Sequence, residues 1–303
     1  MRKALITGGG KFIGSHLAEE LMLRNYEVHI TTSSPQGIEE KYNVGAAVHV
    51  CDIRDFDAMM KLCEGVDYIF HFASHADQAC IDNPIETESV NVGGAVSMLE
   101  VARRTRVKKF IFASSAMVYG DQKQVPLRED LSALPVEPYG LYKYFGERLM
   151  KFWAEQYAVP TVTLRFFNVY GPRDPVGPAA YVIGRLLDRR INKLPLTIDG
   201  DGTDTRDYIH VTDVVRACII AAEHPDVSNG ELFNIATGIE TSLNTLAAHI
   251  GGKVIHLPNR SGSRRGPNRR VADILHAKTV LGWVPNITIE EGIQALKNDL
   301  GIS

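Results

Sequence analysis

The sequence has few of the features that mark secreted, membrane or metal-binding proteins. No segment approaches the run of about 20 apolar residues that a membrane-spanning helix needs. The N-terminal apolar stretch, residues 4–6, is too short for a signal peptide and leads directly into glycines. The four cysteines are widely spaced with no Cys-x-x-Cys pair, which argues against a disulfide framework or a zinc site. We therefore expect a cytoplasmic protein with reduced thiols, no membrane association and no metal.

An excess of one charge is also lacking. The 303 residues include 33 lysines and arginines against 36 acidic residues, so the formal net charge is only -3 and no strong field favours nucleic acid. Any acidic ligand must instead be held by a few local groups. The hydrophobic share is an ordinary 45%, and a chain of this length can bury a large core in one domain or in two closely joined ones.

Apolar runs of strand length alternate with helix-like stretches through the first 170 residues. These runs lie at 3–7, 27–31, 46–50, 67–72, 109–113 and 161–167. The alternation predicts an α/β fold: a doubly wound parallel sheet with helices on both faces and ligands beyond the carboxyl ends of the strands. After about residue 170, shorter segments punctuated by Pro and Gly predict a smaller C-terminal α/β domain. We expect domains at 1–170 and 171–303, with 206–235 packing back on the first.

The first expected strand ends in a glycine-rich turn, Thr7-Gly8-Gly9-Gly10-Lys11-Phe12-Ile13-Gly14. A helical stretch follows, with Ile13, Leu17 and Leu21 on one face. Glycines permit a tight turn and close approach of a ligand, and the N-terminus of a helix attracts a pyrophosphate. The position between strand and helix predicts a Rossmann-type dinucleotide site, and a glycine-rich turn without a ligand is the alternative.

A tyrosine and a lysine four residues apart share one face of a helix, which brings a phenol close to an ammonium group. Two such pairs exist. Tyr119 and Lys123 flank a Gly-Asp turn, where the side chains need not converge. Tyr139 and Lys143 follow Pro138, a favourable first residue of a helix, and continue into a helical stretch. The second pair is therefore the better catalytic candidate.

Together these segments resemble the extended short-chain dehydrogenases/reductases, in particular the UDP-glucose 4-epimerase-like members of the NAD-dependent epimerase/dehydratase family. The turn follows the family fingerprint T-G-G-x-G-F-I-G except that Lys11 stands at the middle glycine. Residues 112–120, Phe-Ala-Ser-Ser-Ala-Met-Val-Tyr-Gly, match the end of the family's fifth strand. The resemblance implies a catalytic set of Ser115, Tyr139 and Lys143. In such a set the tyrosine is the general base, the lysine lowers its pKa and binds the nicotinamide ribose, and the serine hydrogen-bonds the reacting oxygen.

The resemblance also implies the residues of a cofactor site. They are Gly8, Gly10, Lys11, Phe12, Ile13, Gly14, Thr32, Ser33, Asp52, Ile53, Phe72, Ala73, Ser74, Tyr139, Lys143 and Phe166. Thr32 replaces the acid that usually ends the second strand and binds the adenosine ribose, so no carboxylate repels a 2′-phosphate there. Lys11 and the hydroxyls of Thr32 and Ser33 suit that phosphate. We therefore predict NAD(P) and leave NAD and NADP open, because a hydroxyl-rich loop need not discriminate.

A nucleotide-sugar site is implied by further matches to the family. Its residues are Ser115, Ala116, Met117, Asn168, Val182, Leu196, Ile198, Arg206 and Arg265. Arg206 and Arg265 suit a diphosphate through bidentate hydrogen bonds, although Arg265 lies in a cluster of arginines that a solvated loop also explains. Ala116 and Met117 replace the acidic pair of related dehydratases and the glutamate of related decarboxylases. Neither side chain can transfer a proton, which disfavours both reactions.

Oxidation or reduction at one carbon remains, and the resemblance favours a nucleotide-sugar 4-epimerase that works by reversible hydride transfer through a 4-keto intermediate. A UDP-hexose is the expected substrate, because such sugars are the commonest in the family. An NADPH-dependent nucleotide-4-keto-sugar reductase is the alternative, and a cofactor-binding scaffold without turnover is a third interpretation. Family members usually pair through the helices at about 84–104 and 139–157, so we expect a homodimer.

Overall fold

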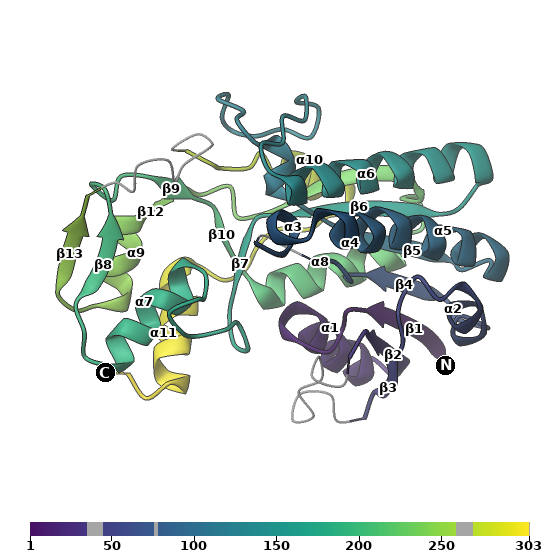
Figure 1. Cartoon of the computed structure of the whole chain (residues 1–303), viewed down its shortest axis with the longest axis horizontal. Coiled ribbons are helices and arrows are strands. Elements are labelled where there is room, and N and C mark those ends of the chain that lie inside the picture. The colour runs from purple at the N-terminus through teal and green to yellow at the C-terminus, as the bar shows by residue number, and fades with distance from the viewer. Residues whose placement is uncertain (35–44, 76–77, 259–268, 303) are drawn as a thin grey trace.

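A seven-stranded parallel sheet organises the computed structural model, which describes residues 1–34, 45–75, 78–258 and 269–302 (Figure 1). The strand order is β11-β6-β5-β4-β1-β2-β3, and every neighbouring pair is parallel. The strands are β1 (Arg2–Thr7), β2 (Tyr26–Thr32), β3 (Ala47–Val50), β4 (Tyr68–His71), β5 (Lys109–Ser115), β6 (Thr161–Phe166) and β11 (Asn229–Ile235). The order reverses between β1 and β4, which is the switch point where doubly wound sheets bind ligands. The predicted fold class and its six strands are confirmed.

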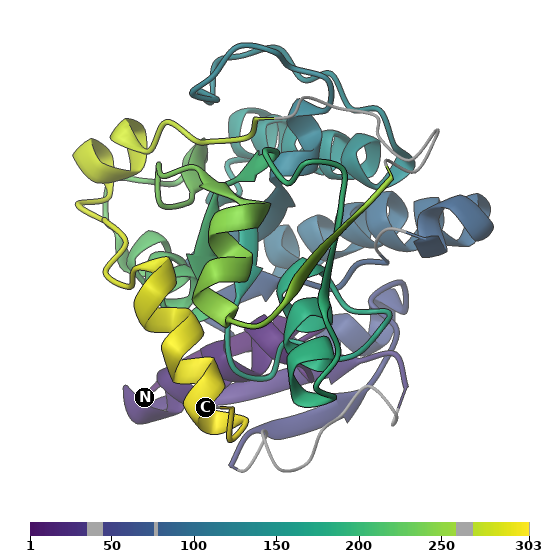
Figure 2. The ribbon, with the colours of Figure 1, turned by 90° about the vertical axis from the view of Figure 1, so that its left-hand side faces the viewer.

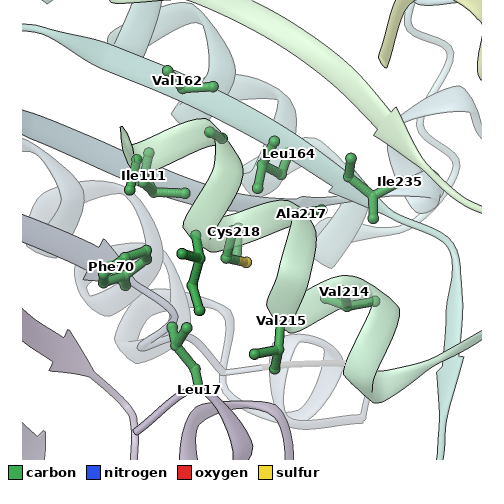
Figure 3. Close-up of a cluster of buried hydrophobic side chains, with 14 of the residues drawn as sticks. Leu17, Phe70, Ile111, Val162, Leu164, Val214, Val215, Ala217, Cys218 and Ile235 are labelled. Carbon is green, nitrogen blue, oxygen red and sulfur yellow. The ribbon is translucent and has the colours of Figure 1, made fainter. Parts of the chain in front are cut away.

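Helices cover both faces of this sheet, because alternate residues of each buried strand point to opposite sides. On one face Ile6 and Ile111 pack against α1 (Phe12–Leu23) and α8 (Val211–Glu223), and Figure 3 shows part of this apolar cluster. On the other face their neighbours Leu5 and Phe110 belong to a second cluster. The helices on that side are α2 (Phe56–Leu62), α5 (Gly94–Thr105) and α6 (Pro138–Tyr157).

Short helices connect β4 to α5 and β5 to α6. They are α3 (Gln78–Asp82), α4 (Pro84–Glu88), a π-helical turn Ser89–Gly93 and a 3₁₀ turn Ala116–Tyr119. The first 166 residues contribute the carboxyl ends of β1, β2, β4, β5 and β6 to one edge of the sheet.

A smaller α/β unit stands beyond the carboxyl ends of the strands, on the left of Figure 1. It contains α7 (Val182–Ile191), β8 (Leu196–Asp199), α9 (Leu243–Ile250), β13 (Val254–Leu257) and α11 (Ile289–Asp299). β8 and β13 pair in parallel, and the helices enclose a third core around Leu186, Leu246 and Ile293. Figure 2 faces this unit and shows the yellow α11 beside the green α9.

The chain crosses between the sheet and the smaller unit more than once. β7 (Asn168–Tyr170) pairs with β10 (Tyr208–His210), and β9 (Thr205–Arg206) with β12 (Thr241–Ser242). Between these crossings α8 packs on the sheet and β11 forms its edge. The last crossing includes α10 (Leu275–Val280), which lies against β11.

Two further observations concern the whole of the described chain. No helix among these residues is long and apolar enough to cross a membrane. All four cysteines have free thiols, and three of them are buried.

Candidate active site

A cavity of about 1080 Å³ lies between the carboxyl ends of the strands and the smaller α/β unit. Its sheet side includes Gly8 after β1, Phe72 and Ser74 after β4, Ser115 at the end of β5 and Phe166 at the end of β6. Its opposite side is formed by residues of α7, β8 and the loop that ends in β9. A second cavity of about 350 Å³ continues from the first, because Gly8, Lys11 and Ser74 line both.

The glycine-rich turn lies where the two cavities meet. Gly8 has a φ of +68°, and a Cβ there would lie 2.7 Å from the Ala73 Cα. A Cβ on Gly14 would lie 2.4 Å from the Gly9 Cα, so the turn closes only with glycine at both positions. α1 begins directly afterwards, and its first residues line the larger cavity. Unpaired N–H groups at this helix N-terminus suit a pyrophosphate.

The smaller cavity is lined by hydroxyl groups rather than by an acid. Its lining residues are Gly8, Gly10, Lys11, Thr32, Ser33, Ser34 and Ser74. Thr32 ends β2, and its hydroxyl donates to the Ser34 carbonyl at 3.1 Å, which leaves the oxygen as a hydrogen-bond acceptor. Lys11 is exposed at the N-cap position of α1. Cationic and hydroxyl groups thus stand where the sequence predicts an adenosine ribose.

Three residues predicted at the cofactor site do not line either cavity in the described structure: Asp52, Ile53 and Ala73. Asp52 binds the Arg54 guanidinium at 2.7 Å, and this partner holds the pKa of the Asp52 carboxyl below its usual range. Ile53 is buried against α5, where a Cβ on Gly94 would lie 2.4 Å from its Cδ1. Ala73 lies directly behind Gly8.

The three predicted catalytic residues line the larger cavity together. Ser115 ends β5 and caps the 3₁₀ turn by accepting a hydrogen bond from the Met117 N–H at 3.2 Å. Tyr139 and Lys143 lie one helical turn apart near the start of α6. A Cβ on Gly140 would lie 2.6 Å from the Met117 carbonyl oxygen, so glycine lets α6 approach the strand end closely.

Lys143 is buried and points back toward β5. Its Nζ donates to the Ala113 carbonyl at 2.8 Å and lies 5.6 Å from the centre of the Tyr139 ring. Burial lowers the pKa of Lys143 to about 8. An ammonium group therefore stands beside the phenol at neutral pH, in surroundings that screen its charge poorly.

Only part of the predicted substrate site lines the larger cavity. Met117, Asn168, Val182, Ile198 and Arg206 line the larger cavity. Ala116 and Leu196 are buried in packing clusters instead. Arg265 lies outside the described residues. Burial lowers the pKa of Arg206, and its guanidinium donates to the Thr205 carbonyl at 2.7 Å.

Comparison with known proteins identifies the family. The model of the NAD dependent epimerase/dehydratase family matches residues 4–236. The chain belongs to this family. A putative UDP-glucose 4-epimerase of Methanocaldococcus jannaschii is 36% identical to it over 304 aligned residues, which cover 97% of each chain.

Two solved structures of the family resemble the whole chain. The UDP-glucose 4-epimerase of Thermotoga maritima, with UDP-glucose, has a TM-score of 0.88 and 33% identity, covering 98% of this chain and 99% of its own. The UDP-glucuronic acid 4-epimerase of Bacillus cereus, with UDP-glucuronic acid and NAD, has a TM-score of 0.87 and 28% identity, covering 99% of both chains.

A buried ionic network behind the predicted catalytic residues was missed by the sequence analysis. Glu147 accepts two hydrogen bonds from Arg165 at 2.7 Å and one from the Ser114 hydroxyl at 2.5 Å. The Arg165 guanidinium lies 4.6 Å from the centre of the Tyr119 ring, and the Tyr119 hydroxyl donates to Asn234 at 2.7 Å. Four elements of the epimerase/dehydratase fold, β5, α6, β6 and β11, are thereby joined. The only signal in the sequence is Glu147, one helical turn after Lys143.

One member of the alternative tyrosine–lysine pair, Tyr119, belongs to the same network. Tyr119 is almost fully buried, and burial raises the pKa of its phenol to about 12. Lys123 is exposed beyond the turn at Gly120. Neither residue lines the larger cavity, so in the described structure this pair has no access to a ligand there.

His71 is a second residue without a sequence prediction. It is fully buried at the end of β4, its Nδ1 lies 3.0 Å from the Thr7 hydroxyl, and its ring stacks on Phe112. Burial lowers the pKa of His71 to about 3, so the ring is neutral. The ring supports the strand ends beneath Lys143 without adding charge.

Proposed function

We propose that this chain is a nucleotide-sugar 4-epimerase that acts by reversible hydride transfer through a 4-keto sugar. The convergence of Ser115, Tyr139 and Lys143 in one cavity carries the proposal. The cavity is large enough for a nicotinamide ring and a sugar, and it continues into the smaller cavity beyond the glycine turn. Relatives named UDP-glucose 4-epimerase align along nearly the whole chain.

The residues present fit a nicotinamide dinucleotide. The glycine turn admits the pyrophosphate onto the N-terminus of α1, and the hydroxyl-lined cavity takes the adenosine ribose. Bound NAD would supply a reversible acceptor for the hydride of the sugar C4, so that either epimer can form without net consumption of cofactor. NAD is present in the B. cereus structure and in that of the Brucella ovis UDP-glucose 4-epimerase. The expected ribose position has Thr32 and Lys11 beside it and no acidic side chain, so we extend the proposal to NADP.

Tyr139 acts as the general base in this proposal. A phenol with a pKa of about 10 is a weak base at neutral pH, and the ammonium of Lys143 stabilises its anionic form. Tyr139 takes the proton from the sugar 4-hydroxyl, and the Ser115 hydroxyl donates to the same oxygen. When the keto sugar is reduced, Tyr139 returns the proton.

The substrate lies between the sheet and the smaller unit in this proposal. Residues 1–170, with 206–235 packing back on them, serve as the dinucleotide domain, and the rest of 171–303 serves as the nucleotide-sugar domain. Arg206 lines the cavity and binds the diphosphate in this proposal, and the Asn168 amide lines the same cavity. Arg265, outside the described residues, is proposed to help through its sequence position. Val182 and Ile198 line the part of the cavity that we assign to the nucleotide base, and Leu196 is packed behind them. Ala116 and Met117 have no proton to transfer, which leaves epimerisation or reduction rather than dehydration or decarboxylation.

We propose a homodimer built on α4, α5 and α6. Leu141, Phe145 and Phe152 form an exposed apolar stripe along α6, and Ile85 and Val96 are exposed on the neighbouring helices. Such a patch on a protein surface marks an interface. Light scattering should give twice the chain mass, and Phe145→Glu should give the monomer. The free thiols suit a cytoplasmic enzyme.

The test is incubation of purified protein with UDP-glucose and catalytic NAD or NADP, followed by chromatography of the sugar nucleotides. An epimerase forms UDP-galactose with no steady-state change in absorbance at the reduced-nicotinamide band. The reductase alternative consumes one reduced cofactor per turnover of a 4-keto sugar. A scaffold forms no product from any nucleotide sugar.

A further inference from the structure

Arg270 is a buried cation in the described structure that has no carboxylate partner. Its side chain is only 9% exposed, and its Nε has no hydrogen-bond partner among the described residues. One terminal nitrogen lies 3.3 Å from the Met117 sulfur and the other donates to the Gly120 carbonyl at a long 3.4 Å. A thioether is a weak acceptor, so these contacts satisfy the guanidinium poorly. Burial of such a group is costly unless an anion compensates it.

The backbone around Arg270 is fixed, which makes this placement specific. The Leu127 N–H donates to the Val271 carbonyl at 2.7 Å, and the Ala272 N–H donates to the buried Asp207 carboxylate at 3.2 Å. Asp207 follows Arg206, the residue proposed for the diphosphate. Burial and the charge of Arg206 lower the pKa of Arg270 on balance, although the charges of Glu137 and Asp121 act to raise it. Two arginines thus raise the potential on one side of the cavity.

Met117 is what separates Arg270 from the cavity. It lines the cavity with Ser115 and Tyr139, and it stands two residues after the serine that binds the sugar O4 in the proposed function. Its unbranched side chain can change rotamer at little cost, which would expose the guanidinium to the substrate. The ring neighbours of C4 on the substrate are C3 and C5, and C5 carries the exocyclic carbon C6. An anion carried there is the C6 carboxylate of a hexuronic acid.

We infer that Arg270 recognises a carboxylate on the sugar. The enzyme is then a 4-epimerase whose substrates are nucleotide-linked uronic acids. The inference rests on the proposed function and narrows its substrate from a neutral hexose to a sugar acid. The planar guanidinium suits a carboxylate through two parallel hydrogen bonds. The fold accepts such substrates, since the B. cereus relative holds UDP-glucuronic acid. Arg270 is then a specificity-determining residue, and Met117 is the side chain that moves aside for it.

The experiment compares UDP-glucuronic acid with UDP-glucose, which differ only at C6. We expect the wild-type kcat/KM for the acid to exceed that for glucose about tenfold or more, as a charge-assisted hydrogen bond allows. Arg270→Met should lower this ratio at least about tenfold, mainly by raising the KM for the acid. Arg270→Lys keeps the charge without the planar fork and should retain part of the preference.

Arg269→Met is the matched control, because Arg269 is exposed and pairs with Glu240 at 2.9 Å on the surface. Its ratio should stay at the wild-type value. Thermal unfolding gives a second readout: saturating UDP-glucuronic acid should raise the Tm of wild-type protein more than UDP-glucose does, and Arg270→Met should remove that difference. A purely structural Arg270 would instead lower the Tm without changing the ratio.

The outcomes separate this inference from the proposed function. Epimerisation of UDP-glucose with an equal or lower kcat/KM for the acid would overturn the role of Arg270 and leave the epimerase standing. Epimerisation of neither sugar, nor of any other nucleotide sugar, would overturn the proposed function itself. If Arg270→Met does not fold, the wild-type ratio and the Arg270→Lys variant still decide.

Discussion

The Lys143 ammonium lies 5.6 Å from the centre of the Tyr139 ring, on the same face of α6 and in the same cavity as Ser115. The lysine is anchored on the other side by the Ala113 carbonyl of β5. Its charge is therefore held at a fixed distance from the phenol, where a low local dielectric increases its effect. This geometry supports the proposal that the two residues act together in proton transfer, and the role of each can be tested separately.

Removal of the Tyr139 hydroxyl should abolish the general base without disturbing the helix. We expect Tyr139→Phe to lose at least about 100-fold in turnover while it still binds cofactor, which rates and dinucleotide titration measure. Tyr142→Phe is the matched control, because that hydroxyl donates to the Pro84 carbonyl, outside the cavity. Near-normal turnover of Tyr139→Phe would remove Tyr139 from the mechanism.

Loss of the Lys143 charge should move the pH dependence of the reaction upward. An opposite charge close to an acid lowers its pKa by about 1 to 3 units. In Lys143→Met the phenol of Tyr139 keeps a higher pKa, so the rising limb of kcat/KM should shift by about 2 units to higher pH.

The pH dependence of the wild-type enzyme provides a second test of the role of Lys143. Burial lowers the pKa of Lys143 to about 8, so cofactor-free enzyme loses the ammonium as the pH rises through that value. Below it, the folded state carries a buried cation at a cost that Lys143→Met avoids, so the variant should not unfold more readily at pH 7. An unshifted rising limb in Lys143→Met would show that the ammonium does not act on the base.

The Glu147–Arg165 pair should contribute to stability rather than to proton transfer. Both side chains are at least 93% buried, so removal of one charge leaves the other without compensation. We expect Glu147→Gln to lower the free energy of unfolding by about 3 to 5 kcal/mol in urea titrations. The control is Glu155→Gln on the same helix, where the exposed pair with Lys151 should cost less than about 1 kcal/mol. Equal effects of the two changes would contradict a structural role for the buried pair.

The sequence predicted the parts of this molecule that depend on local patterns. All six expected strands formed, and the glycine turn lies where a Cβ on Gly8 or Gly14 would clash. The preference for Tyr139 over Tyr119 followed from the turn at Gly120, and burial of Tyr119 explains why it lines no cavity in the described structure.

Features that depend on tertiary pairing were not predictable in the same way. Arg165 carries no local sign that it binds Glu147, because the pair joins a strand to a helix 18 residues away. Ala116 and Leu196 match the family pattern, yet they fill cores because their neighbours on the chain point into the cavity instead. Arg270 looks like one member of a basic cluster until its burial behind Met117 is known.

The preference between NAD and NADP can also be tested at this site. An acid at the end of β2 favours NAD in two ways, by accepting hydrogen bonds from the ribose 2′-hydroxyl and by repelling a 2′-phosphate. Thr32 stands there instead, and its hydroxyl donates to the Ser34 carbonyl, while the exposed Lys11 lines the same small cavity. A contact between Lys11 and the phosphate, worth about 1.5 to 3 kcal/mol, would favour NADP roughly tenfold or more.

We therefore predict that the wild-type protein binds NADP at least as tightly as NAD, and that Thr32→Asp combined with Lys11→Gly reverses the order. Titration of both dinucleotides into cofactor-free protein by calorimetry measures the two affinities directly. The single variants divide the effect: Thr32→Asp adds repulsion of the phosphate, whereas Lys11→Gly removes attraction and restores the family glycine. Thr203→Asp, at an exposed turn of the smaller unit, should leave both affinities unchanged. A strong preference of the wild type for NAD would show that Lys11 points into solvent and that the hydroxyls of the loop do not discriminate.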